Sequence, residues 1–153
     1  SATFQVFGDM DVLSRVLVSD RAIHDTVASL ILDGVFHRHP GLRIASVENG
    51  SDWIHLLVKR LRKQRNQTPW IFHEDPLDTV RRHVWVTPYL EEDLRALADL
   101  IGAERIRVGS DWPHGEGVAE PLDFAAELGG FSEAEKQRIL RDNCLELLGR
   151  PLA

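Results

Sequence analysis

The side chains best suited to metal or acid–base chemistry lie in three short polar segments, each of which follows a stretch rich in apolar residues. The segments are Glu48-Asn49, Thr87-Pro88-Tyr89 and Ser110-Asp111-Trp112-Pro113-His114. Asp111 is the strongest candidate, because a carboxylate beside a buried strand is costly unless a metal, a cation or hydrogen bonds compensate its charge. A structural interpretation stays open, since an aspartate in such a loop also accepts hydrogen bonds from nearby backbone N–H groups.

Alternating strands and helices must position these segments. Short apolar runs predict strands over residues 42–47, 83–87 and 105–109. Apolar residues at helical spacing predict helices over residues 20–39, 51–65, 77–82 and 94–101, followed by a helix that begins near Pro121 and a final helix over residues 132–149. Strands that alternate with helices form parallel sheets, and ligands bind at the carboxyl ends of such strands. The expected fold class is therefore α/β with a parallel sheet, and all three polar segments should meet at one edge.

The ends of the last helix are marked by specific residues. Ser132 and Glu135 have the spacing of a capping box, and Gly149 provides a C-terminal stop. Asn143 lies on the side of this helix that should face the core. We expect its side chain to bond to the backbone at the end of a strand.

The net charge and the cysteine content of the chain limit the partners and the cellular location that can be expected. The 153 residues carry a formal net charge of −6 and include one cysteine, Cys144. Neither nucleic acid nor a membrane is expected as a partner, because both require clustered cations or a long apolar run. A single cysteine cannot form an internal disulfide, so a cytoplasmic location is expected.

Several short segments of the sequence, taken in order, resemble segments of a known protein family. Residues 107–114, 139–144 and 147–149 resemble the C-terminal end of the amidohydrolase-related family, which includes decarboxylases of the aminocarboxymuconate semialdehyde type. Residues 34–53 resemble the family's sixth-strand segment, and residues 78–88 resemble the approach to its seventh strand. The resemblance extends in order from Asp20 to Gly149.

This resemblance implies a distorted (β/α)8 barrel of which the chain supplies the last three strands and their helices. A complete barrel usually takes about 250 residues. Residues 1–19 are expected to form an irregular N-terminal segment, and residues 20–153 to form the C-terminal part of the barrel.

The resemblance also implies a divalent metal, with zinc the expected ion. Family members bind it through a His-x-His pair after the first strand, a His after the fifth and an Asp after the eighth. Only the Asp has a counterpart in this chain, at Asp111. His37 and His39 have the pair's spacing, but they precede Pro40 at the end of a predicted helix and are not expected to be ligands. Because catalytic zinc sites normally need three protein ligands, the isolated chain should be inactive.

The other site residues follow from the same resemblance. Asp111 would bind the metal and hold the proton of a metal-activated water, while His114, Trp112 and Glu48 would contact a small-molecule substrate. Glu48 stands where some family decarboxylases carry a catalytic histidine, so hydrolysis is as plausible as decarboxylation.

Two alternatives remain open. The chain could be a non-catalytic half-barrel that self-associates as a homo-oligomer or pairs with another chain, because a small parallel sheet leaves unpaired edges. Alternatively, Asp111 and Glu48 could perform acid–base hydrolysis without a metal.

Overall fold

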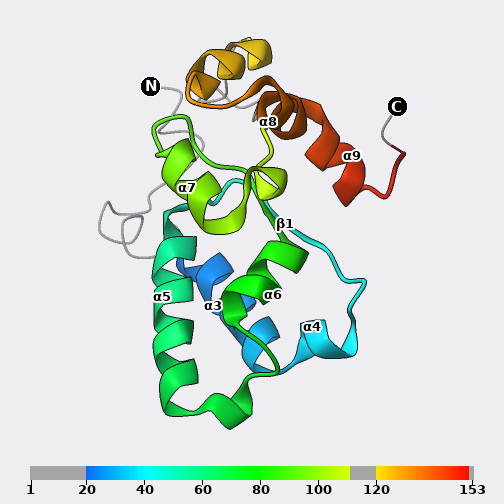
Figure 1. Cartoon of the computed structure of the whole chain (residues 1–153). Helices are drawn as coiled ribbons and strands as arrows, with labels where there is room; N and C mark the ends of the chain where they lie inside the picture. The colour runs from blue at the N-terminus through cyan, green and yellow to red at the C-terminus, as the bar shows by residue number, and fades with distance from the viewer. Residues whose placement is uncertain (1–19, 111–119, 152–153) are drawn as a thin grey trace, which may run out of the picture.

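The computed structural model describes residues 20–110 and 120–151, so the segment expected to be irregular, residues 1–19, lies outside the described residues. Figure 1 shows a mostly helical chain that contains a short sheet. The elements are α3 (Arg21–Leu32), α4 (Val35–Arg38), β1 (Ile44–Ser46), α5 (Asp52–Gln67), the 3-10 helix η1 (Pro69–Ile71), α6 (Pro76–His83), β2 (Val84–Val86), α7 (Leu94–Ile101), the 3-10 helices η2 (Ala103–Arg105) and η3 (Pro121–Leu128), α8 (Glu133–Gln137), the π-helix η4 (Arg138–Asp142) and α9 (Asn143–Leu147). None of the described helices is both long and apolar enough to cross a membrane.

The sheet is parallel, as expected. Strands β1 and β2 pair from Ile44 opposite Val84 to Ser46 opposite Val86. The α/β class with a parallel sheet is therefore confirmed, although the described part of the chain is mostly helical.

The third predicted strand, over residues 105–109, is wrong in its extent. Arg105 instead ends η2, whose backbone bonds include Ile106 N–H to Ala103 O at 3.3 Å. What remains of the strand is a parallel bridge between Val86 and Ile106, with Arg107 N–H donating to Val86 O at 2.9 Å. The 3-10 turn uses backbone groups that a longer ladder would have needed.

The helices cover one face of the sheet. Val84, Val86 and Ile106 are fully buried and belong to the same apolar cluster as Val27 and Leu57 of the helices. Figure 1 shows α5 running alongside α3 and α6, and residues of both helices contact it. Burying a Val, Leu or Ile side chain contributes about 1.5–3 kcal/mol, so this helical layer is what holds the short strands in place.

The single helix predicted over residues 20–39 is wrong. Helix α3 ends at Leu32, and Gly34 adopts a left-handed conformation with φ of 65° before α4 begins. A Cβ on Gly34 would lie 3.2 Å from Nε2 of His73. The glycine thus permits both the break and the close approach of His73, and helical spacing alone could not show either.

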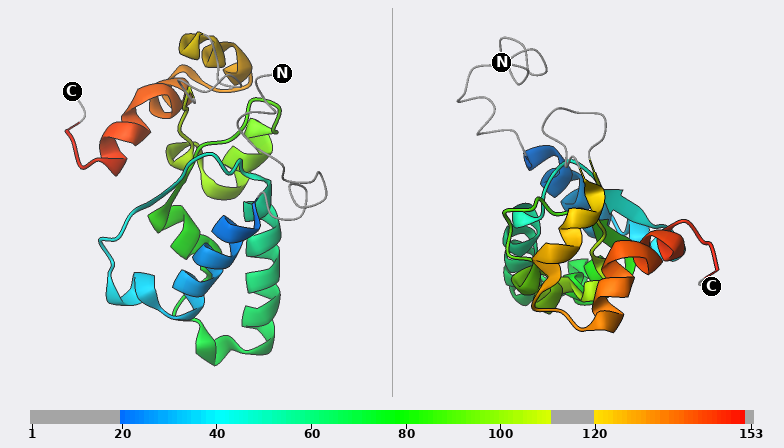
Figure 2. Two further views of the ribbon diagram at one scale, coloured as in Figure 1. Left: turned by 180° about the vertical axis from the view of Figure 1, so that it is seen from behind. Right: turned by 90° about the horizontal axis from the view of Figure 1, so that it is seen from above.

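The C-terminal helices carry their expected end signals. The capping box of Ser132 and Glu135 is present, and Gly149 closes α9 with φ of 68° while Arg150 N–H bonds to Leu145 O at 2.8 Å. Asn143 is fully buried. Its Nδ2 donates to Ile106 O at 2.6 Å and to Ala103 O at 2.8 Å, which confirms the predicted bond to a strand end. Figure 2 shows these helices at the opposite end of the molecule from α4 and η1.

The loops that follow β1 and β2 are joined by the carboxylate of Glu92. Ser51 donates to it twice, from N–H at 2.8 Å and from Oγ at 2.7 Å, and Tyr89 N–H donates at 3.0 Å. Gly50, between these groups, has φ of 57°. A Cβ at this position would lie 2.5 Å from the Glu92 carboxylate and 2.7 Å from the Tyr89 ring. Glycine is therefore required for the two loops to meet.

A second carboxylate joins α5 to α6. Asp75 caps α6 by accepting from Leu77 N–H at 2.9 Å, and it pairs with Arg62 at 3.1 Å and with Arg65 at 3.5 Å. Burial acts to raise the pKa of the Asp75 carboxyl, but the hydrogen bonds from Arg62 and Leu77 and the two arginine charges outweigh it. The pKa of Asp75 is therefore lowered.

We predict that Asp75→Ala lowers the free energy of unfolding by about 1–2 kcal/mol at pH 7, because it removes a helix cap. Since the folded-state pKa lies below the unfolded one, the charge-dependent part of this contribution is present above about pH 4 and is lost as pH falls through the folded-state value. Urea unfolding at pH 7 and at pH 3 measures the change. Asp75→Asn, which keeps the acceptor for Leu77, should cost less at pH 7. The difference in free energy of unfolding between wild type and Asp75→Ala should be smaller at pH 3 than at pH 7. An equal difference at the two pH values would contradict the charged role of Asp75.

We predict that Gly50→Ala lowers the free energy of unfolding by more than about 1 kcal/mol, because alanine is strained at positive φ and its methyl group would meet Glu92 and Tyr89. The matched control is Gly41→Ala, where an added Cβ meets no atom within 4 Å. That change should stay within about 0.5 kcal/mol of wild type. Thermal unfolding measures the loss of stability in each variant. Equal losses in Gly50→Ala and Gly41→Ala would show that the loops after β1 and β2 do not approach each other as closely as described.

Candidate functional site

The polar segments that follow β1 and β2 lie at the same edge of the sheet, as predicted. The ladder continues past β2 through the bond from Thr87 N–H to Ser46 O at 3.0 Å. Beyond it, Glu92 ties the loop that contains Glu48 to the loop that contains Tyr89. Two of the three predicted segments are thus brought together in space.

The remaining predicted site residues cannot be placed. Asp111, Trp112 and His114 all lie outside the described residues. Their roles as metal ligand and substrate contacts stay predictions. The described chain pairs with β2 at Ile106 and Arg107 and continues to Ser110, the last described residue before them.

Glu48 has an unusual backbone. It is solvent-exposed with φ of 59°, a left-handed conformation that costs a residue with a side chain about 1–2 kcal/mol. Asn49 supports the turn, because its Nδ2 donates to Val47 O at 2.5 Å. Non-glycine residues in this conformation concentrate at binding and catalytic sites, where surrounding contacts hold the strain. The loop presents the Glu48 carboxylate at the strand end in a fixed backbone geometry.

A metal site is not complete within the described residues. No group of three or more His, Cys, Asp or Glu side chains converges in residues 20–110 and 120–151. The described residues alone therefore do not fit a divalent metal.

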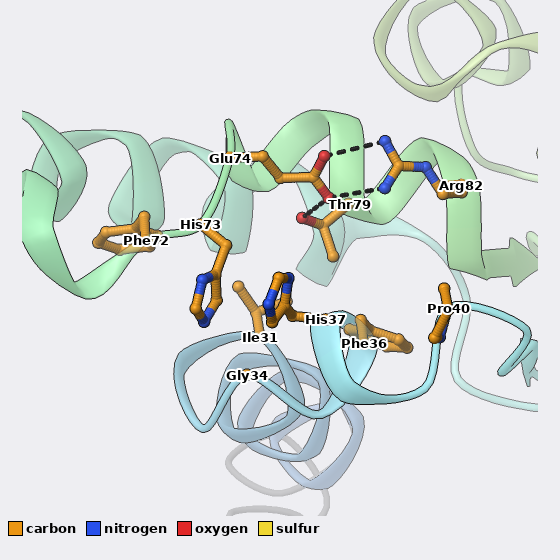
Figure 3. Close-up of a pocket in the computed structure, with 10 residues that line it drawn as sticks. All are labelled: Ile31, Gly34, Phe36, His37, Pro40, Phe72, His73, Glu74, Thr79 and Arg82. Atoms are coloured by element: carbon orange, nitrogen blue, oxygen red, sulfur yellow. Dashed lines mark hydrogen bonds and ion pairs between the residues drawn. The ribbon is translucent and has the colours of Figure 1, made fainter.

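A pocket of about 150 Å³ lies among α3, α4 and α6, on the side from which the chain enters β1. Figure 3 shows the rings of His37 and His73 face to face; their centroids are 3.9 Å apart and their planes differ by 6°. Glu74 accepts from Arg82 at 2.9 Å and from Thr79 at 2.8 Å. Lone pairs of parallel imidazoles do not converge on one ion. The two stacked rings therefore do not present their nitrogens to a common ion.

Sequence reasoning missed Glu92. It stands in the run Glu91-Glu92-Asp93, which has the acidic composition of a helix start, and Asp93 does cap α7 by accepting from Ala96 N–H at 2.9 Å. Its partner Ser51 lies 41 residues away in sequence. No local spacing connects these two residues, so only the three-dimensional structure reveals the bond.

Comparison with known proteins identifies the family of the chain. The family described as amidohydrolase matches residues 17–150. The 2-amino-3-carboxymuconate-6-semialdehyde decarboxylase of Dictyostelium discoideum is 28% identical over 128 residues, which cover 80% of this chain and 35% of that protein.

Solved structures agree with this match. An amidohydrolase from Mycobacterium avium subsp. paratuberculosis K-10 is 56% identical, with a TM-score of 0.87 over 91% of this chain and 36% of that one. A dihydroxybenzoic acid decarboxylase from Polaromonas sp. JS666, solved with manganese and the inhibitor 2-nitroresorcinol, shares the fold at 21% identity, with a TM-score of 0.59 over 84% of this chain and 40% of that one. The chain thus spans well under half the length of these relatives. It belongs to the amidohydrolase family.

Proposed function

We propose that this chain is the C-terminal part of a metal-dependent amidohydrolase-family enzyme, either a hydrolase or a decarboxylase, that acts on a small molecule through a metal-activated water. The observation that carries the proposal is the meeting of the Glu48 and Tyr89 loops at the edge from which the chain leads to Asp111. Ligands of parallel α/β folds bind at this edge.

The proposal gives each residue a role. Asp111 supplies one ligand of a divalent metal, with zinc as the expected ion, and the other ligands come from outside the described residues. A metal in such a site lowers the pKa of its bound water toward neutrality. Glu48, Trp112 and His114 line the substrate pocket. The manganese bound by the Polaromonas decarboxylase, which is 21% identical to this chain in the matched part, supports a divalent metal.

The proposal also includes a cytoplasmic location, which the single cysteine supports, since Cys144 has no second cysteine with which to pair.

We predict that a polypeptide containing both this chain and the preceding strands of the barrel binds one divalent metal, measured by mass spectrometry of the metal content. Asp111→Asn should lower the metal affinity at least about tenfold, because even the loss of a residue that only supports a metal ligand typically costs 10–100-fold. The matched control is Asp99→Asn, which changes an exposed carboxylate paired with Arg95 on α7. A metal-free protein, or one indifferent to Asp111→Asn, would refute the proposal.

Self-association is a second candidate function. Strand β1 pairs with β2 along one edge, and no other described strand pairs with its opposite edge. Such an edge is a template for another strand. A second copy covering it would make the protein a homo-oligomer, and light scattering that reports a monomer across a hundredfold range of concentration would exclude this candidate.

A further inference from the structure

Trp70 is the most exposed aromatic side chain of the part of the chain that the structure describes. It lies in η1, between α5 and α6, and 79% of its surface is exposed. The next residue, Ile71, is 45% exposed, and Phe72 after it is only partly buried. Apolar side chains gathered in this way mark interaction sites on soluble proteins, and tryptophan is among the residues that contribute most to binding at interfaces.

The pocket among α3, α4 and α6 lies directly beside this apolar segment. The chain runs from η1 into Phe72 and His73, which line the pocket (Figure 3). Ile31 and Phe36 form a buried apolar part of its lining, whereas Pro40 is exposed, so the pocket opens to solvent. Its volume is about 150 Å³. A cavity of that size accommodates one benzene-sized ring, such as the six-membered ring of an indole.

The pocket also offers hydrogen-bond acceptors for an indole N–H. The rings of His37 and His73 stack on each other, and their nitrogens make no hydrogen bond with any other described residue. A neutral imidazole has one acceptor nitrogen, and a buried tryptophan N–H generally finds such a partner. The pocket therefore suits a tryptophan side chain both in size and in hydrogen bonding.

The elements around η1 are all present in the described chain. Helix α5 contacts α3, and α6 contacts both α5 and α7. In a (β/α)8 barrel the helices form an outer ring in chain order, so elements that precede this chain would adjoin α3 and leave η1 uncovered. The exposure of Trp70 is therefore not explained by missing parts of a barrel.

The charge distribution favours a second copy of this chain as the partner. Residues 20–82 contain ten basic and eight acidic residues, whereas residues 83–153 contain seven basic and fourteen acidic residues. At the pocket, Glu74 and Arg82 compensate each other at 2.9 Å. Helices α8 and α9, within the acidic part, lie at the opposite end of the molecule from η1. Two copies that meet at η1 thus join nearly neutral surfaces and keep their acidic ends apart, whereas a strongly charged partner would meet no excess of opposite charge there.

We propose that two copies of this chain pair through this face, with Trp70 of each copy seated in the pocket of the other. A projecting ring beside a ring-sized pocket is self-complementary, as a two-fold interface requires. One tryptophan buries about 150–250 Å², so a contact built on two such rings is small and the dimer is weak and concentration-dependent. The contact is separate from the open edge of β1, and it depends neither on a metal nor on catalysis.

Sedimentation velocity of the chain between about 5 and 500 µM tests the proposal, because contacts of this size class dissociate in or above the micromolar range. We expect wild type to change from monomer to dimer across this range. Trp70→Ala should raise the dissociation constant at least about tenfold, the loss expected when a central tryptophan is truncated. The matched control is Leu122→Ala, which removes an apolar side chain that is 84% exposed on η3 and should leave the dimer unchanged.

Two further variants test the ring and the pocket separately. Trp70→Phe keeps an aromatic ring, so it should dimerise more strongly than Trp70→Ala. Pro40→Lys places a long charged side chain at the pocket opening and should weaken the dimer although Trp70 is intact. Both positions are exposed, so circular dichroism should show the same fold in all variants.

Acrylamide quenching of tryptophan fluorescence provides a second readout. Trp53 and Trp85 are each only 2% exposed, so quenching that is lost on Trp70→Phe reports the Trp70 ring. We expect this quenching to decrease as the wild-type concentration rises, because the ring becomes buried in the partner.

Two results would overturn the proposal. One is a wild-type chain that stays monomeric up to the highest concentration, which would leave the pocket to a small molecule or to a different protein. The other is a dimer that Trp70→Ala and Pro40→Lys do not weaken, because the two copies would then meet elsewhere, for example at the open edge of β1.

Discussion

The carboxylate of Glu92 is the constraint on which the candidate site depends. It accepts three hydrogen bonds, two from Ser51 and one from Tyr89, and so fixes the loop after β1 against the loop after β2. The loop after β1 also contains the left-handed Glu48, a conformation that persists only where surrounding contacts hold it. Strands β1 and β2 have only three residues each, so without the Glu92 hydrogen bonds few contacts would hold their carboxyl ends together.

Contacts with the helices also hold the strands in place. The helices bury one face of the sheet, and Asp75 joins α5 to α6. Asn143 binds the backbone at the first residue of η2 and at Ile106, directly after it. Removing water from these groups makes their hydrogen bonds costly to lose, so the short strands gain a fixed register that their own ladder could not give. On the opposite face, Trp85 is buried and the Arg105 guanidinium lies over its ring.

Much of the fold could be predicted from the sequence because its signals are local. Apolar spacing identified α5 and α7, the capping box identified the start of α8, and the order of motifs identified the family. The break at Gly34 and the shortened third strand were missed, because each depends on a competing local turn that apolar spacing does not report. Glu92 was missed for a different reason. Its role comes from a contact with Ser51, which is 41 residues away, and acidic residues before a helix have an ordinary explanation.

The most direct test of this account is amide hydrogen exchange in wild type and in Glu92→Ala. The N–H groups of Ser51 and Tyr89 donate to Glu92, whereas Arg107 N–H donates to Val86 within the sheet and serves as the internal reference. We predict that Ser51 and Tyr89 are protected in wild type and exchange at least about tenfold faster in the variant, while Arg107 changes little. Equal exchange of Ser51 and Tyr89 in the two proteins would show that Glu92 does not hold the loops, and would contradict the account.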